Sequence, residues 1–326
     1  MSGMEQVNTA LAAWYARLFY PRSKRGPAAD DPRLPMPHAK ASPAEIRNHI
    51  RRVVRGAPVV MVKITGTPTG MRGIRSHLSY ITERGEPLYD EQGREYRTPD
   101  EVKTFGDHLR YAGSPIPVDG SRREAFALAL DIPAGDARAV QAAAVEFAQR
   151  EFAGHRWAWA FHSHQGHPHV HLIVRAEGWR GKRLDPRKAD LHRWREVFAQ
   201  ALRARGVEAD ATNRMVRGTV RDKEPIYVTR ARAAGTLERE HPLRDRVTVK
   251  AQTIERALQA WGYIHAALAA SPDTADQALA QDVRAFVERM PMVEHLAGMA
   301  RQRVQEKQRQ SVEQVPQQGQ EPEPGR

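Results

Sequence analysis

The 326-residue chain contains no cysteine. Disulfide frameworks, thiolate catalysis, iron–sulfur clusters and cysteine-bound zinc are therefore excluded, and any metal must be held by histidine and carboxylate ligands. No apolar run approaches the ~18–20 residues of a membrane span, and the first twenty residues lack the pattern of a secretory signal, so we expect a cytoplasmic protein. The chain has 39 acidic residues against 51 basic ones. This excess of positive charge indicates a polyanionic partner, but charge alone does not distinguish DNA from RNA or from an anionic lipid.

Composition and hydrophobic periodicity divide the chain into four regions. The second region carries the densest alternation of strand and helix patterns, whereas the last is low in apolar residues. The expected regions are an N-terminal helix, linker and capped helix over residues 1–56, an α+β domain over 57–220, a helical region over 221–308 and a disordered tail over 309–326.

Within the α+β domain the elements follow the order strand, helix, strand, helix, strand, strand, helix. Strands are predicted over 59–64, 126–132, 157–161 and 170–175, and helices over 74–84, 136–152 and 186–206. The last two strands flank a short histidine-rich turn and are close enough to pair as a hairpin. The expected fold class is α+β, with a central, largely antiparallel sheet and flanking helices.

Five of the 14 histidines lie in the ten-residue segment HSHQGHPHVH. Because successive side chains of a strand point to opposite faces, His169 and His171 project together while the apolar residues that alternate with them face the core. A returning strand can bring His162 to this pair. Three imidazoles leave coordination positions open, as a catalytic metal site requires. Ordinary structural histidines or a nonspecific metal-binding tract are the alternatives, and the apolar alternation favours a built site.

This segment resembles the third motif of conjugative relaxases of the MobP class in the HUH endonuclease superfamily, which reads His-x-Asp, a short spacer and His-x-His. By that resemblance His162, His169 and His171 are ligands of a divalent metal, Mg²⁺ or Mn²⁺. The acidic position of the motif falls on His164, which would coordinate or act as a base instead. The resemblance covers residues 57–220 and implies that they form the catalytic domain.

Relaxases cut one DNA strand by attack of a tyrosine on a phosphodiester. The segment GIRSHLSYITERGE resembles their first motif, so Tyr80 is the expected nucleophile, ahead of Tyr89 and Tyr96. On the predicted helix Tyr80 shares a stripe with His77 and Arg84, where Arg84 could hold a phosphate and His77 could lie near the phenol. A half-buried structural tyrosine is the alternative interpretation of Tyr80.

Two further segments have expected roles. Asp131, at the end of a predicted strand, is expected to cap the following helix rather than to contact substrate. A basic segment with one tryptophan follows the histidine strand and resembles a further relaxase stretch, so we expect it to bind phosphates and to stack on an unpaired base rather than to form a solvated loop. Its expected DNA-binding residues are Trp179, Arg180, Lys182, Arg183, Arg187 and Lys188.

The resemblance implies an enzyme that nicks and rejoins one strand of plasmid DNA, presented as single-stranded or supercoiled DNA at an origin of transfer, through a 5′-phosphotyrosyl intermediate. An accessory DNA-binding protein and a type IV secretion coupling protein are candidate partners. Three alternatives stay open: a rolling-circle replication initiator, a single-tyrosine transposase of the same superfamily, and a non-catalytic basic nucleic-acid-binding protein with a structural metal.

Overall fold

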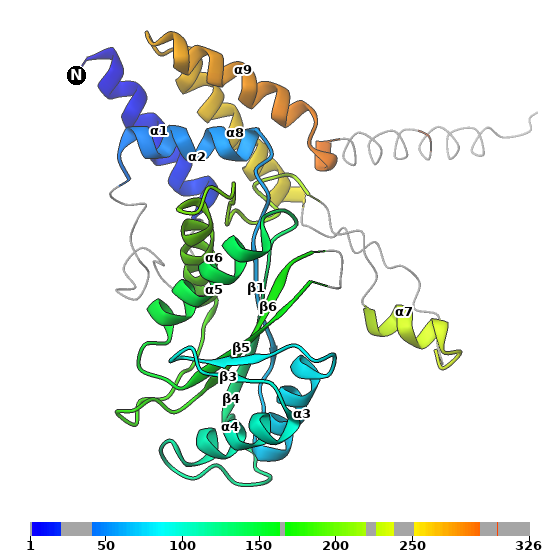
Figure 1. Cartoon of the computed structure of the whole chain (residues 1–326). Helices are drawn as coiled ribbons and strands as arrows, with labels where there is room; N and C mark the ends of the chain where they lie inside the picture. The colour runs from blue at the N-terminus through cyan, green and yellow to red at the C-terminus, as the bar shows by residue number, and fades with distance from the viewer. Residues whose placement is uncertain are drawn as a thin grey trace, which may run out of the picture. The chain divides into compact units, whose positions relative to one another are not determined.

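The computed structural model divides the chain into two compact units (Figure 1). One unit is Tyr20–Thr212, and the other combines Met1–Phe19 with Asn213–Arg326. This grouping divides the expected N-terminal region, residues 1–56, because its first helix belongs to one unit and its second to the other. The described residues are 2–20, 41–163, 167–219, 226–237, 251–293 and 305, so the expected tail and nearly all of the expected linker lie outside them.

A six-stranded sheet, with the order β1-β4-β6-β5-β2-β3, forms the centre of the Tyr20–Thr212 unit. Every neighbouring pair of strands is antiparallel, which confirms the expected α+β class. The two shortest strands come from a stretch of the sequence without clear periodicity. The strands are β1 (Met61–Gly66), β2 (Leu88–Asp90), β3 (Glu95–Tyr96), β4 (Ala125–Asp131), β5 (Trp157–His162) and β6 (His169–Arg175).

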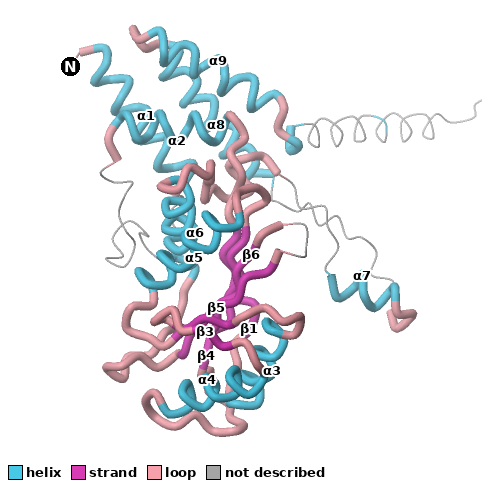
Figure 2. The backbone as a smooth tube through the Cα atoms, in the orientation of Figure 1, coloured by secondary structure: helices cyan, strands magenta, loops and turns pink. Residues whose placement is uncertain are grey.

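Helices pack on both faces of this sheet (Figure 2). On one face α5 (Ala137–Glu151) and α6 (Lys188–Arg203) bury the alternate apolar residues of β4 and β6, which include Leu128 and Leu172. On the other face α3 (Met71–Thr82) and α4 (Pro99–Tyr111) pack on small or aliphatic strand residues, which include Ala160 and Ile173. Both faces of the central strands are therefore covered, and this explains their nearly continuous burial.

Helix boundaries follow local capping signals. The capped helix expected within residues 1–56 is α2 (Pro43–Val54), where the Ser42 side chain accepts from the backbone N–H of Glu45 and the Glu45 side chain accepts from that of Ser42. Helix α3 starts three residues before and ends two residues before its predicted limits. Arg84 therefore lies beyond the helix, and the predicted stripe that joins it to Tyr80 does not form.

The second unit is helical in its described residues, with α1 (Gly3–Phe19), α7 (Ile226–Ala233), α8 (Ala251–Ala269) and α9 (Thr274–Glu288). Trp14 of α1 stacks on Tyr263 of α8 with ring centroids 3.9 Å apart. The indole N–H of Trp261 donates to the carbonyl oxygen of Val216 at 2.8 Å. Across the described residues of both units, none of the helices has the length and apolarity that crossing a membrane requires.

Phe147 gives a test of the α5–α6 packing. Its side chain is fully buried and contacts the rings of Phe152, Trp194 and Phe198 with centroids 5.7–6.3 Å away. We expect Phe147→Ala to lower the free energy of unfolding by about 3–5 kcal/mol, because a cavity replaces the ring. Urea unfolding followed by tryptophan fluorescence measures this loss. The exposed neighbour Gln149→Ala should change stability by less than about 0.5 kcal/mol, and equal losses would contradict the packing described.

Candidate active site

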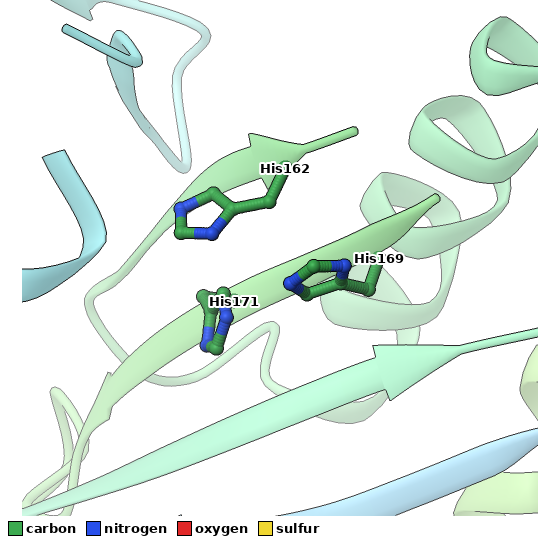
Figure 3. Close-up of side chains that lie close together, drawn as sticks. All are labelled: His162, His169 and His171. Carbon is green, nitrogen blue, oxygen red and sulfur yellow. The ribbon is translucent and has the colours of Figure 1, made fainter. Parts of the chain in front are cut away.

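The pairing of β5 with β6 brings three histidines together. His162 is the Cα partner of His169, and His171 is opposite Ala160. Residues that face each other in an antiparallel pair project from the same side of the sheet, so all three imidazoles share one face (Figure 3). Their ring centroids are 4.6–5.2 Å apart, and one potential ligand atom from each ring lies within 4.8 Å of the others. All three side chains are buried. We call this group the histidine cluster.

Backbone carbonyls orient two of these rings. The Nε2 atom of His162 is 2.9 Å from the carbonyl oxygen of Ile81, and the Nδ1 atom of His169 is 3.0 Å from that of His167. A carbonyl oxygen only accepts, so these two nitrogens carry protons and donate to their carbonyl partners. Outer contacts of this kind are the usual way in which proteins set the tautomer of a metal-binding histidine. The arrangement therefore fits a divalent cation.

Asp131 extends the same row of residues across the sheet. It ends β4 and is the Cα partner of His169, and its Oδ1 atom is buried with no hydrogen-bond partner among the described residues. The expected capping role is wrong, because Asp136 caps α5 by accepting from the backbone N–H of Ala139 at 3.0 Å. Asp131 is thus a candidate site residue that the sequence reasoning missed.

Tyr80 lies beside the histidine cluster, on helix α3. Its ring centroid is 5.9 Å from that of His171, with the two planes nearly perpendicular. The next residue, Ile81, supplies the carbonyl that holds His162, so one helical turn positions both the phenol and a cluster ring. Tyr80 is 51% exposed, and its ring is therefore open to a ligand that approaches from solvent.

The two other candidate tyrosines are bound to carboxylates. The Tyr89 hydroxyl donates to Glu95 at 2.7 Å, and the Tyr96 hydroxyl donates to Asp90 at 3.0 Å. The hydrogen bond to Glu95 raises the pKa of Tyr89, and burial followed by the bond to Asp90 raises that of Tyr96. Both phenols are harder to deprotonate than a free tyrosine, which makes them poor nucleophiles.

His77 lies on the same helix, three residues before Tyr80. Its ring centroid is 6.3 Å from that of Tyr80 and 6.4 Å from that of His171. Burial lowers the pKa of His77 from 6.5 to about 4, so the imidazole is neutral at pH 7. Its Nε2 atom is buried without a hydrogen-bond partner in the described residues.

The remaining residues singled out in the first and third motifs are Arg84 and His164. Arg84 is exposed beyond the end of α3, and its backbone N–H donates to Glu86 at 3.0 Å. His164 lies outside the described residues. Lys63 of β1 was not anticipated from the sequence. The Lys63 side chain is exposed, and Lys63 is the Cα partner of Ala129 on β4. Ala129 is in turn the Cα partner of His171 on β6. Lys63 therefore places a positive charge in the same row of the sheet as His171.

The basic segment that follows β6 lies at the other end of this strand. Its residues come after Arg175, whereas the cluster histidines begin the strand, and six residue steps span about 20 Å. Trp179 is 62% exposed. Four of the expected cations there are also exposed: Arg180, Lys182, Arg187 and Lys188.

Two residues of that segment are held by acidic neighbours. Arg183 forms ion pairs with Glu124 at 3.1 Å and with Glu177 at 3.7 Å, and Arg187 pairs with Asp185. The Arg183 charge is thus largely compensated within the fold. Closeness in sequence to the histidine strand does not place this segment beside the cluster.

Comparison with known proteins matches one segment of the chain to a family. The family model described as Relaxase: MobA/VirD2-like, nuclease domain, matches residues 112–207. This segment contains β4, β5 and β6 with the whole histidine cluster, while helix α3 and Tyr80 precede it. No curated protein sequence matches the chain.

The low pKa of His77 predicts a pH effect on stability. Between pH 6.5 and about 4 the unfolded chain binds a proton at this position that the folded chain does not, so stability falls as the pH decreases through that range. We expect His77→Asn to remove this part of the loss, so that wild type loses about 1–2 kcal/mol more than the variant between about pH 7 and about pH 5. Urea unfolding at both pH values measures the difference. Equal losses in the two proteins would contradict a buried, neutral His77.

Proposed function

We propose that the protein is a relaxase of the HUH type that cuts and rejoins one strand of plasmid DNA at an origin of transfer through Tyr80, and the match of residues 112–207 to a relaxase nuclease domain supports this. The observation that carries the proposal is the position of the Tyr80 ring, 5.9 Å from His171 and open to solvent. One phosphate can therefore meet both the phenol and the histidine cluster.

His162, His169 and His171 would hold one divalent cation. One potential ligand nitrogen from each ring lies within 4.8 Å of the others, backbone carbonyls orient His162 and His169, and burial shields all three rings from bulk water. When bound, the cation polarises the phosphate oxygens and offsets the charge that builds in the transition state. Imidazole ligands suit Mn²⁺ and the later divalent metals better than Mg²⁺, which prefers oxygen, so we infer that Mn²⁺ binds more tightly than Mg²⁺.

The chemistry assigned to Tyr80 is a transesterification. Its phenol oxygen attacks phosphorus, the bond from phosphorus to the 3′ oxygen breaks, and that oxygen leaves as a 3′-hydroxyl once it takes a proton. The 5′ end stays bonded to Tyr80, so a 3′-hydroxyl can later attack the phosphotyrosyl ester and restore the strand. The phenolic proton passes to solvent, to which Tyr80 is 51% exposed, because His77 with a pKa of about 4 is too weak a base to take it.

The proposed function also implies a cellular location, binding partners and alternative roles within the same superfamily. We infer that the protein acts in the cytoplasm on supercoiled or single-stranded origin DNA, with an accessory DNA-binding protein and a type IV secretion coupling protein as partners. A rolling-circle initiator or single-tyrosine transposase would use the same phenol and imidazoles, so origin preference and a conjugation assay separate those roles. A purely structural metal site gives no reason for an exposed tyrosine beside the cluster.

Metal binding is the first test of the histidine cluster. We expect calorimetric titration to show tighter binding of Mn²⁺ than of Mg²⁺, and His169→Ala to weaken Mn²⁺ binding by at least about tenfold, since a ligand is lost. His167→Ala is the matched control, because His167 is exposed and contributes only its backbone carbonyl. A preference for Mg²⁺, or an equal loss in His167→Ala, would show that the cluster is not the binding site.

Tyr80→Phe tests the nucleophile. With supercoiled plasmid carrying the cognate origin and Mn²⁺, wild type should give relaxed circles and a covalent protein–DNA adduct, and Tyr80→Phe should lower both by at least about a thousandfold. Mn²⁺ affinity should stay unchanged, because the phenol is not a ligand. Tyr111→Phe, which alters another exposed tyrosine, should remain active. Adduct formation by Tyr80→Phe would disprove the assignment.

A further inference from the structure

A second candidate binding site lies where helices α2 and α6 end. A cavity of about 680 Å³ is present there, on the segment that leads into β1. Both helices stop at a glycine with a left-handed backbone, Gly56 with φ 79° and Gly206 with φ 75°. Four arginines from the two helix ends line the cavity: Arg51, Arg52, Arg55 and Arg203. We call this cavity the arginine pocket.

The charge of the arginine pocket is strongly positive. Against the four guanidinium groups stand one lining carboxylate, Glu208, and two helix C-termini that together contribute about one negative charge. The net charge is therefore about +2. Within the described residues no carboxylate forms an ion pair with these arginines: Arg51 donates to the side-chain oxygen of Asn48 at 2.7 Å and Arg203 to the carbonyl oxygen of Ala209 at 2.8 Å.

Neighbouring arginines behave differently. Arg205 pairs with Glu146 at 2.6 Å, and Arg193 pairs with Glu151 at 2.9 Å. Among the described residues, close ion pairs therefore form with arginines next to the pocket and with none of the four inside it, while Glu196, Asp210 and Glu208 act on Arg203 only through their charges. Uncompensated positive charge in a cavity is the electrostatic setting in which an anion binds.

Two of the pocket arginines repel each other. The Nε atom of Arg52 is buried and has no hydrogen-bond partner among the described residues. Burial lowers the pKa of Arg203 and the nearby charge of Arg52 lowers it further, and the charges of Glu196, Asp210 and Glu208 oppose this shift only in part. An anion between the two guanidinium groups would remove this repulsion and would satisfy their donors in a charge-assisted, often bidentate geometry.

The pocket lies at the same end of the sheet as the histidine cluster. Met61, the first residue of β1, is the Cα partner of Asp131, which in turn is the partner of His169. Adjacent strands are about 4.8 Å apart, so the backbones of Met61 and His169 are about 10 Å apart. Pro58 of the pocket precedes Met61 by three residues, or about 10 Å of extended chain. The arginine pocket is therefore within a few nucleotides of the candidate cut site.

We propose that the arginine pocket binds the phosphodiester backbone of single-stranded DNA a few nucleotides from the phosphate that Tyr80 attacks. The identity of the polyanion rests on the proposed function. Among the residues that the structure describes, no aromatic side chain lines the pocket, so its recognition is of phosphate and not of a nucleobase or free nucleotide. A single strand can bend around the edge strand β1 from the histidine face to the pocket, whereas duplex DNA is stiff over about 150 base pairs.

The test removes two accessible pocket charges. The pocket variant carries both Arg51→Gln and Arg55→Gln. The control variant carries both Arg138→Gln and Arg150→Gln, which removes the same amount of charge from exposed positions on α5. Fluorescence anisotropy with a labelled single-stranded origin oligonucleotide, in the presence of EDTA, measures the binding constant at several salt concentrations. The salt slope is the slope of the logarithm of this constant against the logarithm of the salt concentration. Each lost phosphate contact should reduce the salt slope by about 0.7, so the pocket variant loses about 1.4. The affinity ratio of wild type to pocket variant then shrinks about sevenfold between about 50 and about 200 mM salt.

The control variant should keep the wild-type slope, and Arg51→Lys with Arg55→Lys, which keeps both charges, should restore it. If the pocket and α5 variants lose the same amount of salt slope, the effect comes from the net charge of the protein and not from the pocket, and the proposal is overturned. A slope loss seen with duplex DNA but not with the single strand would overturn it as well. Because the assay contains no metal and needs no cleavage, an inactive Tyr80 would leave its result unchanged, so the two proposals fail separately.

Discussion

The register between β5 and β6 is the constraint on which the candidate active site depends. Opposition of His162 to His169 places three imidazoles on one face, and a shift by a single residue would turn His162 to the other face. That opposite face of β6 is filled by Leu172 and Val174, which pack beneath α5 and α6. A slipped register would bury a histidine among those side chains, so core packing holds the cluster together.

Helix α3 completes this arrangement from the other side. Its buried residues Ile74, Leu78 and Ile81 pack on the sheet, and this packing fixes how the exposed Tyr80 meets the cluster. The Ile81 carbonyl at the same turn holds His162. The histidine cluster and Tyr80 are therefore positioned by one hydrophobic contact, although α3 and β5 are far apart in the sequence.

Local patterns predicted much of this structure. Alternation identified β6 and its two histidines, and the capped helix expected within residues 1–56 is present as α2. Features that depend on pairing between distant segments were not visible: Asp131 joins the site only through its register with His169, and Trp179 follows the histidine strand in sequence yet lies at its far end. The sequence did not indicate a binding role for the arginines of α2, because the pocket that they line forms only where the end of α6 packs beside them.

Mapping the covalent adduct tests most directly whether Tyr80 and the histidine cluster act on one phosphate. Trypsin cuts after Arg75 and Arg84, so the peptide Ser76–Arg84 contains Tyr80 as its only tyrosine. After DNA digestion, mass spectrometry of the adduct should find a phosphate-linked nucleotide on this peptide, and at a Mn²⁺ concentration below the wild-type dissociation constant His169→Ala should form at least about tenfold less of it. A nucleotide on the peptide that contains Tyr89, or an undiminished amount of adduct in His169→Ala, would contradict the account.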